Sequence, residues 1–120
     1  MIVEDEPTVR KAATLALGRD GFSVLAAADG VEALEIFRLH RNEIGCVVCD
    51  LTMPRMNGWE TLTALRQLVP GIPVILASGY SEAQAMAGDH PEQPQAFLHK
   101  PYEAKVLINA INQILPHRNA

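Results

Sequence analysis

The sequence contains no long apolar run, no excess of basic residues and only two cysteines. No apolar run approaches the roughly 20 residues that a membrane-spanning helix needs. The first residues, MIVEDEP, lack the basic start and the long apolar stretch of a secretory signal. We therefore expect a cytoplasmic domain that makes no membrane contact itself.

The shortage of basic residues limits the partners of the chain. Lys and Arg number 10 against 14 Asp and Glu, which gives a formal net charge of -4 and leaves no basic stripe. Direct nucleic-acid binding needs a concentrated basic surface, so we expect none. Hydrophobic residues (48%) and charged residues (20%) occur at the shares typical of globular proteins. This composition excludes disorder of the whole chain and predicts one folded domain over residues 1–120.

The two cysteines, Cys46 and Cys49, have the spacing of a redox pair or of half a metal site. We interpret them instead as two inert thiols in a buried strand, because positions three apart on a strand point to opposite faces. Free cysteine usually behaves as a small buried hydrophobic residue. The motif therefore predicts core packing rather than chemistry.

Five short apolar runs alternate with amphipathic stretches along the chain. The runs predict strands at residues 2–3, 22–26, 46–49, 74–77 and 96–98. Helical spacing of apolar residues predicts one helix that begins at Pro7 and ends at Gly21 and another, over 31–37, that follows an N-cap at Asp29. The same spacing predicts helices at 59–68, 81–87 and 103–115.

Strands that alternate with helices predict a parallel sheet with right-handed crossovers. The pattern predicts a single three-layer α/β sandwich with about five helices. The first strand starts at residue 2, so we expect it to be clipped at the N-terminus. Gly88, Pro91 and Pro94 should end the fourth helix early and make it short.

Polar side chains follow four of the predicted strands. Ligands of open α/β sheets bind beyond the carboxyl ends of the strands, so the residues there are candidates for function. They are Glu4, Asp5 and Glu6 after the first strand, Asp50 after the third, Ser78 after the fourth and Lys100 after the fifth. Carboxylates, a hydroxyl and an ammonium should therefore meet at one edge of the sheet.

This combination of groups has a chemical rationale. Clustered carboxylates repel one another, and Mg²⁺, which prefers oxygen ligands, neutralises them. A carboxylate beside such a cation can attack a phosphoryl group and form an aspartyl phosphate, while Lys100 and Ser78 supply the charge and the donor that transferring oxygens need. Taken singly, Asp50 could be a solvated loop acid, Ser78 a turn residue, and Glu6 an acid favoured at a helix N-terminus.

Four segments resemble the receiver domains of two-component response regulators and hybrid sensor histidine kinases. They are V-E-D-E-P at 3–7, V-V-C-D-L-T-M-P-R-M-N-G at 47–58, I-L-A-S-G-Y at 75–80 and F-L-H-K-P-Y at 97–102. The last two look more like receivers attached to hybrid kinases than like DNA-binding regulators. The resemblance implies a flavodoxin-like fold with a five-stranded parallel sheet of order 2-1-3-4-5.

The same resemblance implies a phosphoryl-transfer site. Asp50 matches the phosphoacceptor, and the implied donor is a histidine kinase or a histidine phosphotransfer domain. The implied metal is Mg²⁺, with Mn²⁺ as a substitute. Its implied ligands are Glu4, Asp5, Asp50 and the backbone carbonyl of Thr52.

The resemblance also implies residues that switch with phosphorylation. Ser78 matches the switch hydroxyl, Lys100 the lysine that pairs with the phosphate, and Phe97 the aromatic residue that moves with Ser78. The Lys100–Pro101 peptide matches one that is usually cis in the family. Glu4 stands where Asp is common, Ser78 where Thr is common, and Phe97 where Tyr is frequent.

Other functions compete with this interpretation. A phosphatase of the haloacid-dehalogenase type also uses an Asp after a strand, but it needs a second acid two residues on, where Thr52 stands. A flavin-binding protein of the same fold needs a phosphate-cradling loop after the first strand, where three successive acids have the wrong charge. A receiver-fold interaction module that is not phosphorylated would have lost the acid pair, Asp50 or Lys100.

We therefore expect a phosphoacceptor rather than an enzyme. We also expect a monomer or weak dimer, because the short fourth helix removes part of the usual dimer face.

Overall fold

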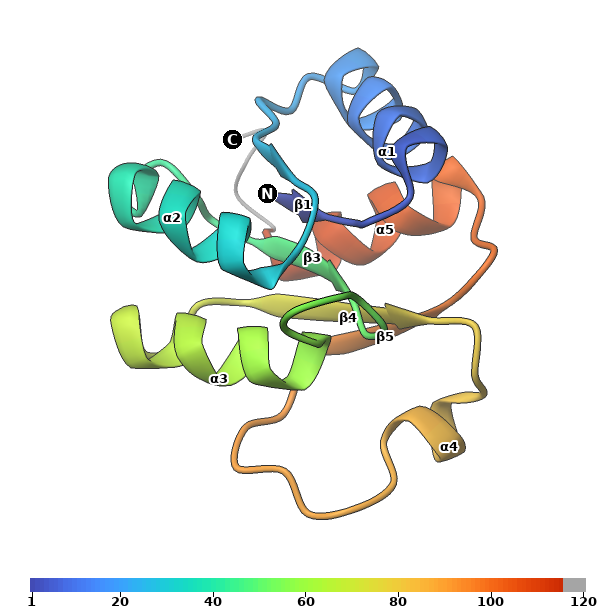
Figure 1. The fold of residues 1–120 in the computed structure, drawn as a ribbon. Helices are drawn as coiled ribbons and strands as arrows, with labels where there is room; N and C mark the ends of the chain where they lie inside the picture. Colours follow the sequence, from blue (N-terminus) through green and yellow to red (C-terminus); the bar gives the residue numbers. More distant parts are fainter. Residues whose placement is uncertain (116–120) are drawn as a thin grey trace.

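The structure, a computed structural model, describes residues 1–115; the domain predicted over 1–120 also includes 116–120, which lie outside the described residues. Strands and helices alternate along the chain as predicted (Figure 1). The strands are β1 (Ile2–Val3), β2 (Ala26–Ala27), β3 (Val47–Asp50), β4 (Val74–Ser78) and β5 (Ala96–His99). The helices are α1 (Pro7–Arg19), α2 (Gly30–His40), α3 (Gly58–Leu68), α4 (Glu82–Ala85) and α5 (Ala104–Ile114).

The five strands form one parallel sheet in the order β2-β1-β3-β4-β5, which confirms the predicted topology. Helices α1 and α5 cover one face of the sheet, and α2 and α3 cover the other (Figure 1). The sheet is therefore the middle layer of the predicted flavodoxin-like sandwich. No helix within residues 1–115 is long and apolar enough to cross a membrane.

The central strands are buried on both sides. Every residue of β3 and β4 is buried, as expected for apolar strands of a covered parallel sheet. Phe37, Leu62 and Leu65 of α2 and α3 fill one face, and Leu17 and Leu107 of α1 and α5 fill the other. These two core layers hold the carboxyl ends of the strands in a fixed relation.

Cys46 and Cys49 are buried free thiols on opposite faces of the sheet, as predicted. Cys46 packs under α1 and α5, whereas Cys49 packs under α2 and α3. Burial raises the pKa of Cys46 to about 11. Burial, with the charge of Asp50 added, also raises the pKa of Cys49. Both thiols therefore stay protonated near neutral pH, which favours core packing over redox chemistry.

Local sequence signals explain where the helices begin. Pro7 occupies the first position of α1, where its missing N–H leaves no bond unmade. Asp29 caps α2, because its side chain accepts a hydrogen bond from the backbone N–H of Glu32. Asn57 and Glu60 form a capping box at the start of α3, where the sequence indicated only a loop.

Several predicted boundaries differ from the observed ones; the helix predicted over 31–37, for example, is observed as Gly30–His40. The second strand is β2 alone, so residues 22–25 of the predicted strand 22–26 lie outside it. Its neighbour β1 has two residues, and both pair with the two residues of β2. The fourth helix is short, as predicted, but it is a single turn over Glu82–Ala85 rather than two turns over 81–87, and Met86 is its C-cap.

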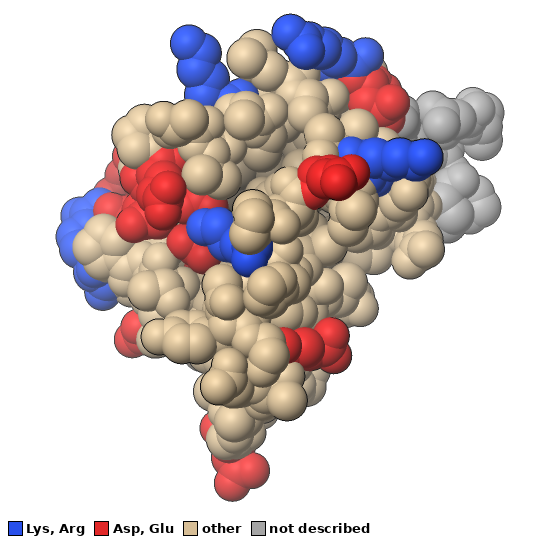
Figure 2. Space-filling model, turned by 90° about the vertical axis from the view of Figure 1, so that its right-hand side faces the viewer, with Lys and Arg blue, Asp and Glu red and all other residues tan. Residues whose placement is uncertain are grey.

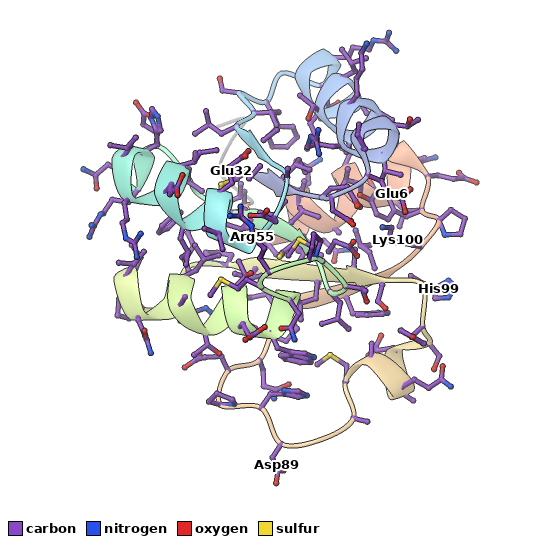
Figure 3. All side chains as sticks on the ribbon, in the orientation of Figure 1. Glu6, Glu32, Arg55, Asp89, His99 and Lys100 are labelled. Carbon is purple, nitrogen blue, oxygen red and sulfur yellow. The ribbon has the colours of Figure 1, made fainter. Side chains whose placement is uncertain are left out.

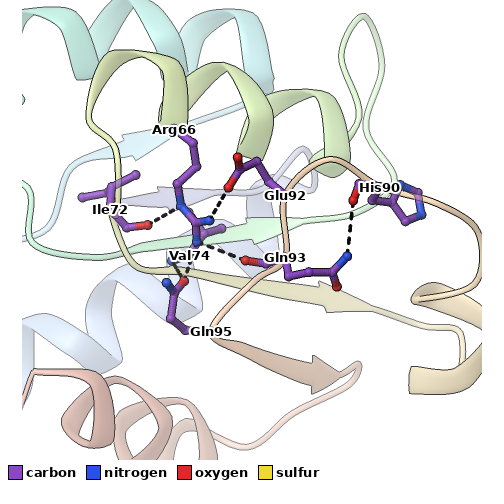
Figure 4. Close-up of polar contacts among 7 residues, drawn as sticks. All are labelled: Arg66, Ile72, Val74, His90, Glu92, Gln93 and Gln95. Carbon is purple, nitrogen blue, oxygen red and sulfur yellow. Dashed lines mark hydrogen bonds and ion pairs between the residues drawn. The ribbon is translucent and has the colours of Figure 1, made fainter.

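The segment between α4 and β5, residues 86–95, is fastened to α3 (Figure 4). The Arg66 guanidinium of α3 donates hydrogen bonds to three acceptors there, Glu92 Oε1 at 2.8 Å, the Gln93 carbonyl at 3.2 Å and Gln95 Oε1 at 2.7 Å. The rings of Trp59 and His90 stack with their centroids 3.6 Å apart. These contacts hold against α3 the segment that follows the short helix α4.

Candidate functional site

The polar side chains predicted to follow the strands meet at one edge of the sheet. β3 ends at Asp50 and β4 at Ser78, while Glu4 and Lys100 follow directly after β1 and β5. All four residues therefore lie at the carboxyl ends of parallel strands in one sheet. Figure 2 looks onto this edge and shows an acidic patch with a basic side chain beside it.

Three carboxylates form the centre of the site. One oxygen each of Glu4, Asp5 and Asp50 lies within 4.8 Å of the others. Glu4 and Asp50 are only 3% and 6% exposed, so little water screens the repulsion between their charges. Such a cluster needs either a positive partner or a proton on one of the carboxyl groups.

Lys100 is the positive partner that the structure provides. Its Nζ donates a hydrogen bond to Glu4 Oε1 at 2.8 Å and lies 3.5 Å from Asp50 Oδ2. Burial lowers the pKa of Lys100, but the hydrogen bond to Glu4 and the charges of Asp50 and Glu4 outweigh burial and raise the pKa above its ordinary value. Lys100 is therefore a charged group shared between two carboxylates.

Asp50 is strongly perturbed by its neighbours. Burial, followed by the charge of Glu4, raises its pKa to about 7 against the opposing effect of Lys100, and Asp5 adds to the rise. Two nearby acids thus outweigh one ammonium. An additional cation would lower this pKa again, because positive charge favours the ionised carboxylate.

Ser78 contributes a buried hydroxyl to the same edge. The residue is 1% exposed, and its Oγ accepts a hydrogen bond from the backbone N–H of Tyr80 at 3.1 Å. The hydroxyl therefore holds the first residues of the loop after β4. Asp50 pairs with Ala77 in the neighbouring strand, so Ser78 lies one residue further along β4.

A cavity of about 710 Å³ opens beside these groups. Its polar end is lined by Asp5, Asp50, Thr52 and Lys100. The cavity continues between α1 and α5 along apolar side chains that include Val9, Ala12 and Leu107. The site therefore has room for a phosphoryl group beside Asp50 and an apolar surface next to it.

The other predicted residues lie around this centre. Thr52 is exposed in the loop after β3 and lines the cavity. The Lys100–Pro101 peptide bond is cis. Phe97 is half-buried in β5 and packs against the core under α2 and α3. His99, the residue before Lys100, is exposed and its side chain points away from the sheet (Figure 3).

Some contacts of the site had no signal in the sequence. Arg10 Nη1 donates to the Glu4 carbonyl at 2.8 Å, and the backbone N–H of Glu6 donates to Glu4 Oε2 at 3.2 Å. Both contacts fix the turn that presents Glu4. Tyr102 lines the cavity, and burial, followed by the charge of Glu4, raises the pKa of its hydroxyl. From sequence alone, Arg10 is an ordinary residue of a helix surface.

The donor set fits a hard divalent cation. Three carboxylate oxygens lie within 4.8 Å of one another, and Thr52 lines the same cavity from the loop after Asp50. Mg²⁺ prefers oxygen ligands and is usually held by one or two carboxylates together with waters. One ammonium does not balance three carboxylates, so the excess negative charge favours a cation here.

Comparison with known proteins agrees with this description. The family model of the response regulator receiver domain matches residues 1–112. The sensor kinase CckA of Brucella abortus (strain 2308) is 40% identical over 116 residues, which cover 96% of this chain and 12% of the kinase. The transcriptional regulatory protein GlrR of Escherichia coli (strain K12) is 30% identical over 115 residues, which cover 96% of this chain and 26% of GlrR. The chain thus spans a small part of each relative.

Solved structures resemble the chain over nearly its whole length. The receiver domain of the hybrid histidine kinase CckA is 35% identical, with a TM-score of 0.81 and 95% of each chain covered. A response regulator receiver domain protein from Clostridium thermocellum is 30% identical, with a TM-score of 0.86 and coverage of 98% of this chain and 93% of the other. A chain of the CheX-CheY-BeF3-Mg+2 complex from Borrelia burgdorferi is 25% identical, with a TM-score of 0.85 and coverage of 95% and 86%.

Proposed function

The chain belongs to the response regulator receiver domain family, the phosphoacceptors of two-component signalling, and on this premise we propose that Asp50 is the residue that accepts the phosphoryl group. One observation carries the proposal. Asp50 is a buried carboxylate at the end of β3 that shares a cluster with Glu4, Asp5 and the Lys100 ammonium. The cluster opens onto a cavity with room for a phosphoryl group.

The transfer is a displacement at phosphorus. A carboxylate oxygen of Asp50 forms a bond to phosphorus, while the bond from phosphorus to the donor histidine nitrogen breaks and the nitrogen keeps the electron pair. Only ionised Asp50 can attack. Its pKa of about 7 in this structure means that a large share of molecules carries the nucleophile near neutral pH.

The metal ligands that we propose are Glu4, Asp5, Asp50 and the backbone carbonyl of Thr52, with Mg²⁺ as the ion and Mn²⁺ as a substitute. When bound, the ion supplies positive charge to the carboxylates and to the transferring oxygens. The similarity to a chain of the CheX-CheY-BeF3-Mg+2 complex supports this choice of ion. Glu4 also holds Lys100 beside the acceptor through the 2.8 Å hydrogen bond.

Lys100 and Ser78 are the residues that we expect to change partners on phosphorylation. In the structure, Lys100 Nζ bonds to Glu4, and Ser78 Oγ accepts a hydrogen bond from the loop after β4. A phosphoryl group adds about two negative charges and several acceptor oxygens at Asp50, so the ammonium and the hydroxyl turn toward it. The loop after β4 then follows Ser78, Phe97 moves with it, and the surface that a partner reads changes.

The phosphoryl donor that we infer is a histidine kinase or a histidine phosphotransfer domain, the kinds of protein with which receiver domains interact. The apolar part of the cavity between α1 and α5 adjoins its polar end and provides a surface for an amphipathic helix of the donor. The similarity to sensor kinase CckA supports a place in a hybrid kinase. We infer no direct nucleic-acid contact, given the net charge of -4, and a monomer or weak dimer.

Labelling with a small phosphodonor tests the role of Asp50. Wild-type protein incubated with Mg²⁺ and acetyl phosphate should gain one phosphoryl group, detected by intact-protein mass spectrometry. Asp50→Asn should gain none, because an amide cannot form the acyl phosphate. Asp89→Asn is a matched control, since Asp89 is exposed at the tip of segment 86–95, away from the site (Figure 3). Normal labelling of Asp50→Asn would contradict the proposal.

A further inference from the structure

The loop between β3 and α3 contains a strained turn centred on Arg55. This residue has a φ of 64°, in the left-handed region that non-glycine residues rarely adopt. The backbone N–H of Met56 donates to the Pro54 carbonyl at 2.7 Å. A hydrogen bond of this span around a positive φ defines the rare, strained form of the γ-turn. Such strain persists only where surrounding contacts hold it in place.

A nearly buried carboxylate supplies a contact that holds this turn. Nε and Nη2 of Arg55 both donate to Asp29 Oδ2, at 2.9 and 2.7 Å. The other oxygen, Oδ1, accepts the backbone N–H of Glu32 at 2.9 Å, which makes Asp29 the N-cap of α2. The Asp29 side chain is 11% exposed and that of Arg55 is 59% exposed, so the carboxylate is the anchored partner. In Figure 3, Arg55 lies beside the first turn of α2, close to Glu32.

The same loop carries the backbone ligand that we propose for the metal. Thr52 and Arg55 both lie in the loop that follows Asp50. The backbone N–H of Gly58 donates to the Leu51 carbonyl at 2.8 Å and closes this loop at its base. Thr52 and Arg55 thus lie in one loop whose two ends are tied together, and we expect a change of direction at Arg55 to move Thr52.

We propose that the ion pair between Arg55 and Asp29 is a positioning device for the phosphoacceptor site: it holds the γ-turn and thereby keeps the Thr52 carbonyl beside the carboxylate cluster. Arg55 is thus a positioning residue, which acts through Thr52 and touches neither the metal nor the phosphoryl group. The inference rests on the proposed Mg²⁺ site at Asp50. It adds to that site a link to α2, which contributes no ligand of its own.

Electrostatics alone and the positioning role predict opposite effects of an Arg55 substitution on Mg²⁺ affinity. Removal of a positive charge strengthens the binding of a cation. The positioning role predicts weaker binding instead, because groups that orient a metal ligand typically contribute about 10–100-fold to metal affinity. The sign of the change in Mg²⁺ affinity therefore separates the two effects.

Calorimetric titration of Mg²⁺ into the folded variants tests the proposal. Arg55→Ala should bind Mg²⁺ about tenfold more weakly than wild type. Glycine adopts a positive φ without strain, so Arg55→Gly loses the ion pair but leaves the turn accessible, and it should keep more of the Mg²⁺ affinity than Arg55→Ala. Asp29→Asn keeps a good N-cap but loses the charge that pairs with Arg55. In the double variant with Arg55→Ala, it should therefore cause little further loss of Mg²⁺ affinity.

Arg66→Ala is the matched control, because it also removes an arginine that makes an ion pair, but one that fastens segment 86–95. Its Mg²⁺ affinity should stay at the wild-type value. A second readout needs no metal: hydrogen exchange at the Met56 amide, the donor of the γ-turn, should accelerate in Arg55→Ala and not in Arg66→Ala.

If the wild-type protein binds Mg²⁺ normally, two results would overturn the positioning role. One is unchanged or tighter Mg²⁺ binding by Arg55→Ala. The other is unchanged exchange at the Met56 amide in Arg55→Ala. Failure of the wild-type protein itself to bind Mg²⁺ would overturn the proposed function together with this inference, so the two failures are distinguishable.

Discussion

Lys100 has two competing roles at the scale of single residues. In the structure its ammonium balances Glu4 and Asp50, and after phosphorylation we expect it to pair with phosphate oxygens. A bound metal ion neutralises the same carboxylates. Lys100 and the metal therefore compete in the resting protein but act together on the phosphoryl group.

A substitution of Lys100 should separate these roles. We expect Lys100→Met to bind Mg²⁺ about tenfold more tightly. Two unit charges about 4 Å apart near a protein surface interact by roughly 4 kcal/mol, and a tenfold change in affinity needs only about a third of that energy. The same variant should bind the phosphoryl mimic beryllofluoride more weakly, because it lacks the cation that faces the fluorines. Calorimetric titrations measure both affinities. Lys105→Met, at an exposed position of α5, is the control, and weaker Mg²⁺ binding by Lys100→Met would contradict the competition.

The sequence predicts some site residues well because each follows a strand with a clear pattern. Asp50 comes directly after an apolar run and Lys100 one residue after a second such run, and the parallel sheet brings such ends together. The pair of Asp29 and Arg55 could not be predicted in this way. These residues are 26 positions apart, and a positive φ at an arginine leaves no mark in the residue type.

Helix α3 is the element whose start matters most to the site, because it follows the loop after Asp50. Asn57→Ala removes its capping box and should lower the free energy of unfolding by about 1 kcal/mol, measured by urea denaturation. Ser81→Ala removes the same kind of box from α4, a single turn, and should lower stability much less. Equal losses in the two variants would contradict the larger structural role of α3.

Element boundaries are predictable where local sequence sets them. The helix predicted at 59–68 is observed as Gly58–Leu68, because capping and apolar spacing act within the helix. The course of the chain after the fourth helix depends instead on distant contacts. Segment 86–95 is held by Arg66 and by the stack of Trp59 on His90, and helical propensity carries no information about these tertiary contacts.

At the scale of the whole molecule, folding opposes the ionisation of Asp50. Its pKa rises from 3.8 to about 7, so the folded protein retains a proton that the unfolded chain releases, and the Asp50 contribution lowers stability as pH rises between those values. The contribution of Asp29 to stability depends on pH in the opposite direction. The backbone N–H of Glu32, together with Arg55 and against burial, holds its pKa below the ordinary value, so its stabilisation is lost only as pH falls below 3.8.

The separation of these two pH windows allows a test on the whole protein. In EDTA, wild type should lose stability to urea between about pH 5 and about pH 8, whereas Asp50→Asn, which cannot ionise at this position, should lose less and should be the more stable protein at the higher pH. Mg²⁺ should stabilise wild type more at the higher pH, because a proton no longer competes for the carboxylate. A parallel loss of stability in wild type and Asp50→Asn would show that the raised pKa belongs to another group.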